Sequence, residues 1–252
     1  MASAAACRLL DHEGRLALSG WLQDKPETCV AVHLLCHDLC QAWVAGEPAS
    51  PQAALVQPDP EPRQLAGFGA DAESLRGLLD HVHQWESIEV EPMVVVQLGP
   101  TVAGGRVRSY DNICFAATGP VTRIDHPLVR RLRPTDRRAI ELFGRLNPGA
   151  WFGDTMTLLR QGFAVGAVSS GELVALAFSA AVTRRQATIA AYTLESGRGK
   201  GLGRAAVSLA CRAAELRGLV PVLNCGAGNV PALAIARRLG LVECGRRTLL
   251  IR

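Results

Sequence analysis

The chain has 252 residues, of which 48% are hydrophobic and 20% are charged. This composition supplies a buried core and excludes a mainly disordered chain. The net charge of +4 is divided unequally, because residues 1–127 hold 8 basic and 16 acidic side chains while residues 128–252 hold 19 and 7. The difference, 8 − 16 = −8 against 19 − 7 = +12, predicts an acidic module followed by a basic one that binds an anionic ligand.

The sequence contains no run of apolar residues long enough for a membrane-spanning helix, and its first residues do not resemble a signal peptide. The eight cysteines are scattered and form no CxxC pair, which is typical of buried thiols in a reducing compartment. We therefore expect a cytoplasmic protein without a membrane partner. The arginines form no long run and few aromatic residues accompany them, so we do not expect nucleic-acid binding either.

The first module is predicted to alternate helices and strands between proline-rich turns. Its predicted elements, in chain order, are a helix or buried strand at 30–41, strands at 41–46 and 53–57, a helix at 71–82, a strand at 88–98 and a loop at 99–105. Residues 118–134 contain Gly-Pro, His-Pro and Arg-Pro pairs, which indicates the connection between modules. The sequence shows no internal repeat.

The second module predicts a mixed α/β layer. Its predicted elements are helices at 135–146 and 154–161, a hairpin of strands 163–168 and 173–182, a strand at 187–194, a helix at 201–217, a strand at 220–225, a helix at 229–239 and a closing strand at 241–252.

A glycine-rich turn, Arg198-Gly-Lys-Gly-Leu-Gly-Arg204, joins one of these strands to the following helix. Its three glycines let backbone N–H groups approach a ligand closely. The helix start offers unpaired N–H donors and about half a positive charge, to which three cationic side chains are added. The segment therefore predicts a phosphate or pyrophosphate site. Its spacing matches neither GxxxxGK[ST] nor GxGxxG.

The spacing Arg198-x-x-Gly201-x-Gly203 resembles the acyl-CoA loop of the GNAT superfamily of N-acetyltransferases, Gln/Arg-x-x-Gly-x-Gly/Ala. Further along, Asn229-Val-Pro-Ala232 and Arg238-Leu-Gly-Leu241 are similar to the family's Asn-x-x-Ala/Ser and Lys-Leu-Gly-Phe segments. The resemblance covers residues 128–252. More loosely, the whole chain is similar to two-part bacterial acetyltransferases related to the zwittermicin A resistance protein, which also carry a segment like Asp125-His-Pro-Leu-Val129.

The resemblance implies that strands 187–194 and 220–225 run parallel and part where acetyl-CoA, the expected cosubstrate, enters. The residues that it implies for CoA binding are Tyr192, Thr193 and Leu194 beside the pantetheine arm, Arg198, Gly199, Lys200, Gly201, Leu202, Gly203 and Arg204 around the phosphates, and Asn229 through its side chain.

Attack of an amine on a thioester requires a neutral amine, so a base or a water chain must take its proton. Glu195, at the end of the strand, and Tyr192, on the same strand, are the two candidate bases. The developing negative charge on the carbonyl oxygen needs a backbone N–H donor near the end of that strand. Many family members have a Tyr, which protonates the thiolate, where this chain has Ala236, and Leu241 replaces the family's Phe.

His33, Cys36, His37 and Cys40 follow helical spacing and are residue types that bind zinc. Four ligands along one straight helix cannot surround a single metal ion, although two of them could bind one with ligands from elsewhere. We expect a buried helix or strand with small thiols here and no metal site. We likewise expect no metal in the reaction.

The sequence thus predicts an α/β mixed-sheet fold in which a GNAT-like acyl-CoA transferase domain, residues 128–252, follows a smaller α/β N-terminal domain, residues 1–127. The predicted reaction transfers acetyl from acetyl-CoA to a primary amine of a small molecule by direct attack in a ternary complex. The acidic N-terminal domain is expected to form part of the acceptor site, and Glu86, Glu89 and Glu91 are its candidate acids for a cationic amine.

Two other functions stay open: a non-catalytic CoA-binding or CoA-sensing module, and a protein or peptide N-acetyltransferase. The family often ends in two strands where this chain predicts one. We expect the other strand to come from the first module or from a second copy of the chain in a homodimer.

Overall fold

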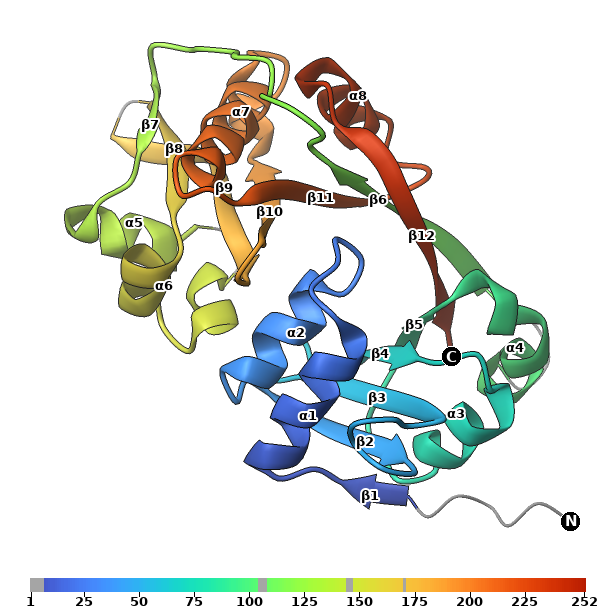
Figure 1. Cartoon of the computed structure of the whole chain (residues 1–252). Coiled ribbons are helices and arrows are strands. Elements are labelled where there is room, and N and C mark those ends of the chain that lie inside the picture. Colours follow the sequence, from blue (N-terminus) through green and yellow to red (C-terminus); the bar gives the residue numbers. More distant parts are fainter. Residues whose placement is uncertain (1–6, 104–107, 144–146, 170) are drawn as a thin grey trace, which may run out of the picture. The chain divides into compact units, whose positions relative to one another are not determined.

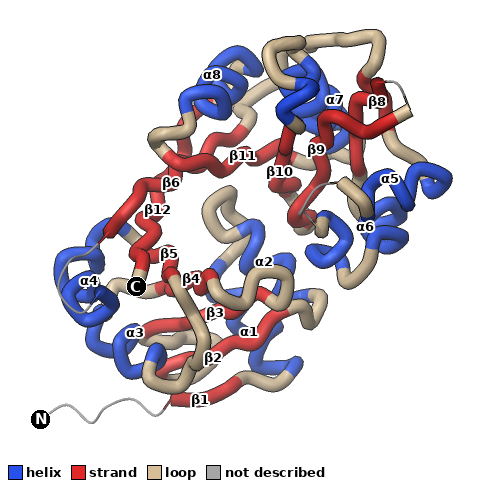
Figure 2. Tube along the Cα trace, turned by 180° about the vertical axis from the view of Figure 1, so that it is seen from behind, coloured by secondary structure: helices blue, strands red, loops and turns tan. Residues whose placement is uncertain are grey.

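The computed structural model of the chain describes residues 7–103, 108–143, 147–169 and 171–252. The chain folds into two compact units, one made of residues 1–113 with 246–252 and the other of residues 114–245. The division at 113/114 precedes the predicted boundary at 127/128, and the end of the chain returns to the first unit. Figures 1 and 2 show the elements of both units from two opposite sides.

The first unit is a mixed sheet with helices. Its elements are β1 (Cys7–Leu9), α1 (His12–Leu22), α2 (Cys29–Cys36), β2 (Cys40–Ala45), β3 (Ala53–Pro58), β4 (Gln64–Phe68), α3 (Ala72–Leu79), β5 (Ser87–Val90), the 3-10 turn η1 (Pro92–Val94), α4 (Val95–Ala103) and most of β6 (Arg108–Ala116). Its strand order is β1-β2-β3-β4-β5-β12-β6, where β12 (Val242–Ile251) is the last strand of the chain. Each strand from β1 to β3 is antiparallel to the next strand in the chain. The β4–β5 pair is parallel, and β5 pairs antiparallel with β12.

The second unit has the same kind of sheet. Its elements are β7 (Val129–Arg131), η2 (Pro134–Asp136), α5 (Arg137–Glu141), η3 (Pro148–Phe152), α6 (Thr155–Gln161), β8 (Ala164–Ser169), β9 (Glu172–Val182), β10 (Gln186–Thr193), η4 (Glu195–Gly197), α7 (Leu202–Glu215), β11 (Val220–Gly226), α8 (Val230–Leu239) and the start of β12. Its strand order is β6-β11-β10-β9-β8-β7. The β10–β11 pair is parallel, and β7 to β10 pair antiparallel in sequence.

The alternation of side chains along β9 explains how helices cover both faces of this sheet. Successive residues of a strand point to opposite faces. Leu176 and Phe178 pack into one buried cluster with α5, η3 and α6, whereas Ala175 packs into another with Leu202 of α7. The buried face of α7 is rich in alanine, so this helix lies close to the sheet.

The segment predicted to connect the modules packs against α7. The Glu215 carboxylate accepts a hydrogen bond from the N–H of Val121 at 2.7 Å, and the Ser208 hydroxyl accepts one from the N–H of Ile124 at 2.9 Å. Residues 121–124 are thereby fixed to the second unit.

Several elements differ from the prediction. The predicted strand 88–98 ends at Val90 and is followed by η1 and α4, because Pro92 occupies the first position of η1 and has no N–H for a sheet. Residues 30–41 divide into α2 and the start of β2. The predicted helix 135–146 becomes η2 and α5, which ends at Glu141, and residues 144–146 lie outside the described residues.

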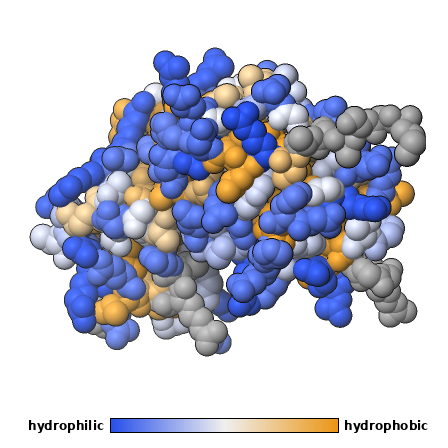
Figure 3. Space-filling model, turned by 90° about the horizontal axis from the view of Figure 1, so that it is seen from below, coloured by the Kyte–Doolittle hydropathy of each residue, from blue (hydrophilic) through white to orange (hydrophobic). Residues whose placement is uncertain are grey.

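The exposed large apolar side chains are scattered over both units, and Figure 3 shows hydrophilic and hydrophobic residues interspersed on one face. Among the described residues, no helix combines the length and the apolar character that crossing a membrane requires.

Candidate functional site

The parallel strands β10 and β11 separate part-way along their length. Gln186 to Thr188 pair with Val220 to Val222, and no pair follows among the described residues, although β10 continues to Thr193 and β11 to Gly226. The pairing register between β10 and β9 shifts between Thr188 and Ile189, at the same level. Because such irregularities bend a strand and increase its twist, the shift turns β10 away from β11.

The backbone of β10 beyond the separation offers hydrogen-bonding groups on the side away from β9. The N–H of Leu194 donates to the carbonyl of Val174 on β9 at 2.9 Å. Because residues of an antiparallel strand alternate in the side to which their backbone groups point, the groups of Thr193 point to the separation. The Thr193 carbonyl accordingly accepts a hydrogen bond from Nε of Arg198 at 3.4 Å. Of the predicted residues 192–194, Thr193 therefore presents its backbone to the separation and Leu194 does not.

The predicted glycine turn lies between the end of β10 and the start of α7. Gly199 and Gly201 have φ angles of +74° and +77°, which side-chain-bearing residues rarely adopt, and a Cβ at Gly199 would meet nothing within 4 Å. Gly201 is the residue that caps the helix, and it caps without a side chain. The first N–H groups of α7 have no partner within the helix, and no described residue accepts a hydrogen bond from the N–H groups of residues 199–204.

Gly203 allows the first turn of α7 to approach the strand. A Cβ at this position would lie 2.5 Å from Oγ1 of Thr193. The side chain of Leu202, by contrast, is buried against Val174 and Ala175 of β9. Gly203 and Leu202 thus fix the start of α7 against β10 and β9.

Three cationic side chains surround the turn. Nζ of Lys200 donates to the carbonyl of Ser196 at 2.9 Å, and the Arg198 guanidinium donates to Thr193 as described above. The guanidinium of Arg204 lies beside Gly201, and its buried Nε has no hydrogen-bond partner among the described residues. A buried N–H without a partner is costly in free energy, so the start of α7 is suited to an anionic ligand.

Tyr192 and Glu195 lie at the end of β10. Tyr192 is 43% exposed, and its ring stands edge-on to that of Phe143 at 6.2 Å between centroids. Glu195 opens η4 with its side chain exposed. The position where the family has a Tyr, Ala236, is fully buried in α8.

Cys225 lies on the part of β11 that continues beyond its last pair with β10. The resemblance implies this strand but not the residue at which its pairing with β10 stops, so Cys225 is not among the predicted site residues. Burial raises the pKa of this half-buried thiol, so its sulfur carries a proton at neutral pH.

Asn229 caps α8. Its side-chain oxygen accepts a hydrogen bond from the N–H of Ala232 at 3.2 Å. The amide oxygen is therefore committed to the helix, and the NH2 group is the part of Asn229 left for a ligand.

The four candidate zinc residues do not share one helix. His33 and Cys36 belong to α2, His37 follows the helix, and Cys40 begins β2. The imidazole rings of His33 and His37 lie 4.5 Å apart. Among the residues that the structure describes, no group of His, Cys, Asp or Glu has the arrangement of a metal site.

The acids proposed to attract a cationic acceptor have arginine partners within the first unit. Glu86 pairs with Arg63, while Glu89 and Glu91 pair with Arg247 at 3.5 and 3.1 Å. Their charges are thus largely balanced inside the unit.

The profile of the GNAT acetyltransferase family matches residues 121–246, which is half of the chain. The chain belongs to the GNAT acetyltransferase family. Acetyl-CoA is the cosubstrate of GNAT enzymes, and the separated strands, the glycine turn and the unpartnered Arg204 fit this ligand.

Solved structures share the fold at low identity. A GCN5-related N-acetyltransferase-like protein from Streptococcus suis is 19% identical with a TM-score of 0.70, over 95% of this chain and 98% of that one. A GCN5-related N-acetyltransferase from Sphaerobacter thermophilus is 14% identical with a TM-score of 0.64, over 98% and 95%. A tandem GNAT protein from the clavulanic acid biosynthesis pathway is 12% identical with a TM-score of 0.55, over 98% of both chains. No curated protein matches the chain, so the likeness to zwittermicin-type enzymes stays a prediction.

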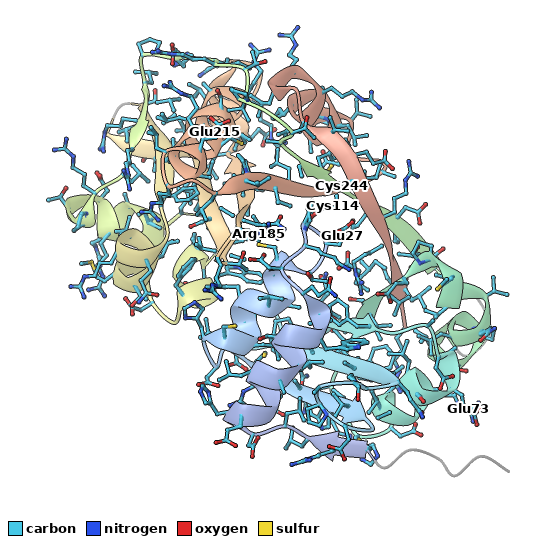
Figure 4. All side chains as sticks on the ribbon, viewed as in Figure 1. Glu27, Glu73, Cys114, Arg185, Glu215 and Cys244 are labelled. Carbon is cyan, nitrogen blue, oxygen red and sulfur yellow. The ribbon has the colours of Figure 1, made fainter. Side chains whose placement is uncertain are left out.

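The sequence predicts only one closing strand in the second module, where the family often has two, and the structure shows a further strand beside β11. Beside β11 the structure places the end of β6, and the N–H of Ala117, just after β6, donates to the carbonyl of Pro221 at 3.1 Å. The first half of the chain therefore supplies this strand. Next to it, the thiols of Cys114 on β6 and Cys244 on β12 lie 3.4 Å apart (Figure 4).

Proposed function

We propose that the second unit binds acetyl-CoA and transfers its acetyl group to a primary amine of a small molecule. The observation that carries this proposal is the separation of β10 from β11 directly ahead of a cationic glycine turn that opens α7. A flat, fully paired sheet would leave no backbone groups for a ligand at this point. Family membership supports the same activity.

The proposed roles in acetyl-CoA binding follow from the contacts of each residue. The N–H groups of residues 199–204 hold the pyrophosphate, because they point out of the start of α7 without acceptors. Arg204 adds a full charge, and Nε of its guanidinium gains the partner that it lacks. Thr193 pairs with the pantetheine arm through its backbone groups, as an added strand would. Asn229 contributes its NH2 group.

The proposed chemistry needs a proton acceptor and a donor of hydrogen bonds near the end of β10. Acetyl-CoA supplies the thioester carbonyl, and a neutral amine must approach it. We assign proton removal from the amine to Glu195, an exposed carboxylate two residues beyond the end of β10, with Tyr192 as the second candidate. The developing charge on the carbonyl oxygen is stabilised by a backbone N–H at the end of β10.

The position from which a tyrosine protonates the leaving thiolate in many family members holds the buried Ala236 in this chain. The protonated thiol of Cys225 lies on β11, beyond the last pair of this strand with β10. We assign to it the contact with the leaving sulfur. A Cys225→Ser variant that releases CoA at an unchanged rate contradicts this assignment.

Two measurements test the proposed function. Calorimetry with acetyl-CoA tests binding, and a thiol-release assay with a panel of small primary amines tests transfer. Binding together with amine-dependent thiol release supports the proposal. Binding without release from any amine favours a CoA sensor, whereas release only with peptides favours a peptide N-acetyltransferase. No binding at high micromolar acetyl-CoA refutes all three.

A further inference from the structure

The two units repeat one order of elements. The first repeat runs from β1 to β6 and the second from β7 to β12. In each, a first strand is followed by helical segments, three antiparallel strands, a helix, a parallel strand, a further helical segment and a last strand. Each repeat contains one parallel pair of strands joined through a helix. In the first repeat α3 joins β4 to β5, and in the second α7 joins β10 to β11. The last strands are exchanged: β12 pairs with β5, and the end of β6 neighbours β11.

The repeat gives the first unit a counterpart of the separation between β10 and β11. Gln64 to Ala66 pair with Ser87 to Glu89. Beyond Ala66, β4 ends at Phe68, and beyond Glu89, β5 ends at Val90. The strands therefore stop almost where their mutual pairing stops, whereas β10 and β11 each continue for several residues beyond their last common pair.

Arg247 occupies the position where β4 and β5 stop pairing. Its Nη2 donates to the carbonyl of Gly67 on β4 at 2.5 Å and to the carbonyl of Glu89 on β5 at 2.9 Å. One nitrogen thus joins both strands at the last pair, through Glu89 of that pair and through Gly67, one residue past it. The guanidinium also lies 4.4 Å from the centroid of the Phe68 ring.

The charge of Arg247 is balanced in place. Its Nη1 bonds to Glu91 at 3.1 Å, and its Nε lies 3.5 Å from the carboxylate of Glu89. The side chain is 9% exposed. Because an arginine is buried only where partners offset its desolvation, these contacts make Arg247 a fixed part of the first unit.

The start of α3 differs chemically from the start of α7. Three residues, Gly69, Ala70 and Asp71, join β4 to α3. The Asp71 carboxylate caps the helix by accepting from the N–H of Glu73 at 3.2 Å and from the hydroxyl of Ser74 at 2.5 Å. The Glu73 side chain adds a second negative charge in the first turn (Figure 4). Both carboxylates repel a phosphate, and the cap already occupies a donor that a phosphate needs.

We propose that the first unit is a second copy of the acyl-CoA-binding fold whose ligand position is filled by Arg247, so that the chain binds one acyl-CoA and binds it in the second unit. This inference rests on the proposed function. It assigns to the Arg247 side chain the role of a built-in occupant, carried by β12, which itself pairs with β5 on the side away from β4.

The test is the number of CoA molecules bound per chain, measured by calorimetry with CoA. The wild-type protein is compared with a Lys200→Glu/Arg204→Glu variant, which reverses two charges at the start of α7. The matched control is Arg237→Glu/Arg238→Glu, the same reversal at two exposed arginines of α8. We expect one CoA for the wild type and the control, and at least a 30-fold loss of affinity for the α7 variant.

Each outcome decides between the two proposals. Two CoA molecules per chain, or one that survives the reversal at α7 with unchanged affinity, overturn the assignment of the first unit while leaving acyl-CoA binding intact. No CoA bound by the wild type overturns the proposed function and this inference with it.

Thermal unfolding tests the role of Arg247 independently of CoA. Arg247→Met is compared with Arg76→Met, which removes an exposed arginine from α3 of the same unit. We expect a midpoint several degrees lower for Arg247→Met and one bound CoA in both variants. Equal midpoints contradict the contact between β4 and β5. Should Arg247→Met not fold, Arg247→Lys repeats the comparison, and the CoA count of the wild type is unaffected.

Discussion

Gly199 and Gly218 lie before and after α7 with nearly the same φ angle. Their φ angles are +74° and +72°, and a Cβ added to either would meet nothing within 4 Å. An alanine in the left-handed region costs about 1–2 kcal/mol. Gly199→Ala and Gly218→Ala should therefore lower the free energy of unfolding by similar amounts, about 1–2 kcal/mol, without a steric clash in the unliganded protein.

The two substitutions should differ in their effect on acetyl-CoA. Gly199 belongs to the turn whose N–H groups are proposed to hold the pyrophosphate, and a methyl there would project into the open space in which the ligand would lie, whereas Gly218 follows the far end of the helix. Loss of one hydrogen bond to a charged group costs about 1.5–3 kcal/mol. At 1.4 kcal/mol for each factor of ten, Gly199→Ala should raise the Kd about 10- to 100-fold, and Gly218→Ala should leave it unchanged.

Calorimetry with CoA gives the Kd, and urea unfolding gives the stability of both variants. A Gly199→Ala protein whose Kd stays within twofold of that of Gly218→Ala refutes the assignment of the pyrophosphate to this turn. Equal weakening of binding by both variants attributes the effect to stability alone and refutes it as well.

Four further predictions follow from single features. Glu195→Gln should lower kcat at least tenfold while the KM for acetyl-CoA stays within twofold, and an unchanged kcat excludes Glu195 as the base. The pKa of Asp136 is held down by its hydrogen bonds from Arg130, so this pair stabilises the fold above the unfolded pKa of about 4. The stability deficit of Asp136→Asn at pH 7 should shrink as pH falls below about 4, and a deficit that is constant with pH contradicts the pairing. Burial raises the pKa of Cys211 to about 12, so iodoacetamide at pH 8 should modify the exposed Cys36 and spare Cys211 in native protein, as mass spectrometry of peptides would show. A chain ending at residue 245 should expose β5 and lower the unfolding midpoint, and an unchanged midpoint is inconsistent with the β5–β12 pairing.

The second unit follows its sequence closely because its signals are local. Glycines form the turns before and after α7, and Asn229 and Asp154 cap the helices that follow them. The hairpin of β8 and β9 lies where two apolar runs flank a Ser-Ser-Gly-Glu turn. The parallel partner of β10 also lies where the resemblance implied it.

The first unit is harder to predict because its signals compete or lie far apart. The cap at Asp11 and the buried Leu18 and Leu22 mark α1, but acidic and basic residues interrupt the apolar pattern. β6 is exposed in its first half and buried in its second, so it shows no alternation. The partner of β5 lies at the opposite end of the chain, and a single sequence carries no local signal for such a pairing.

The exchange of β6 and β12 has a consequence for the order in which the protein is made. A ribosome releases the chain from its N-terminus, and domains of many proteins fold in that order. β5 cannot pair with Thr248 to Ile251 until these residues have been synthesised, and until then it is an unpaired edge that favours aggregation. The second unit already has β6 when its own strands emerge. The half that is translated first is therefore completed last.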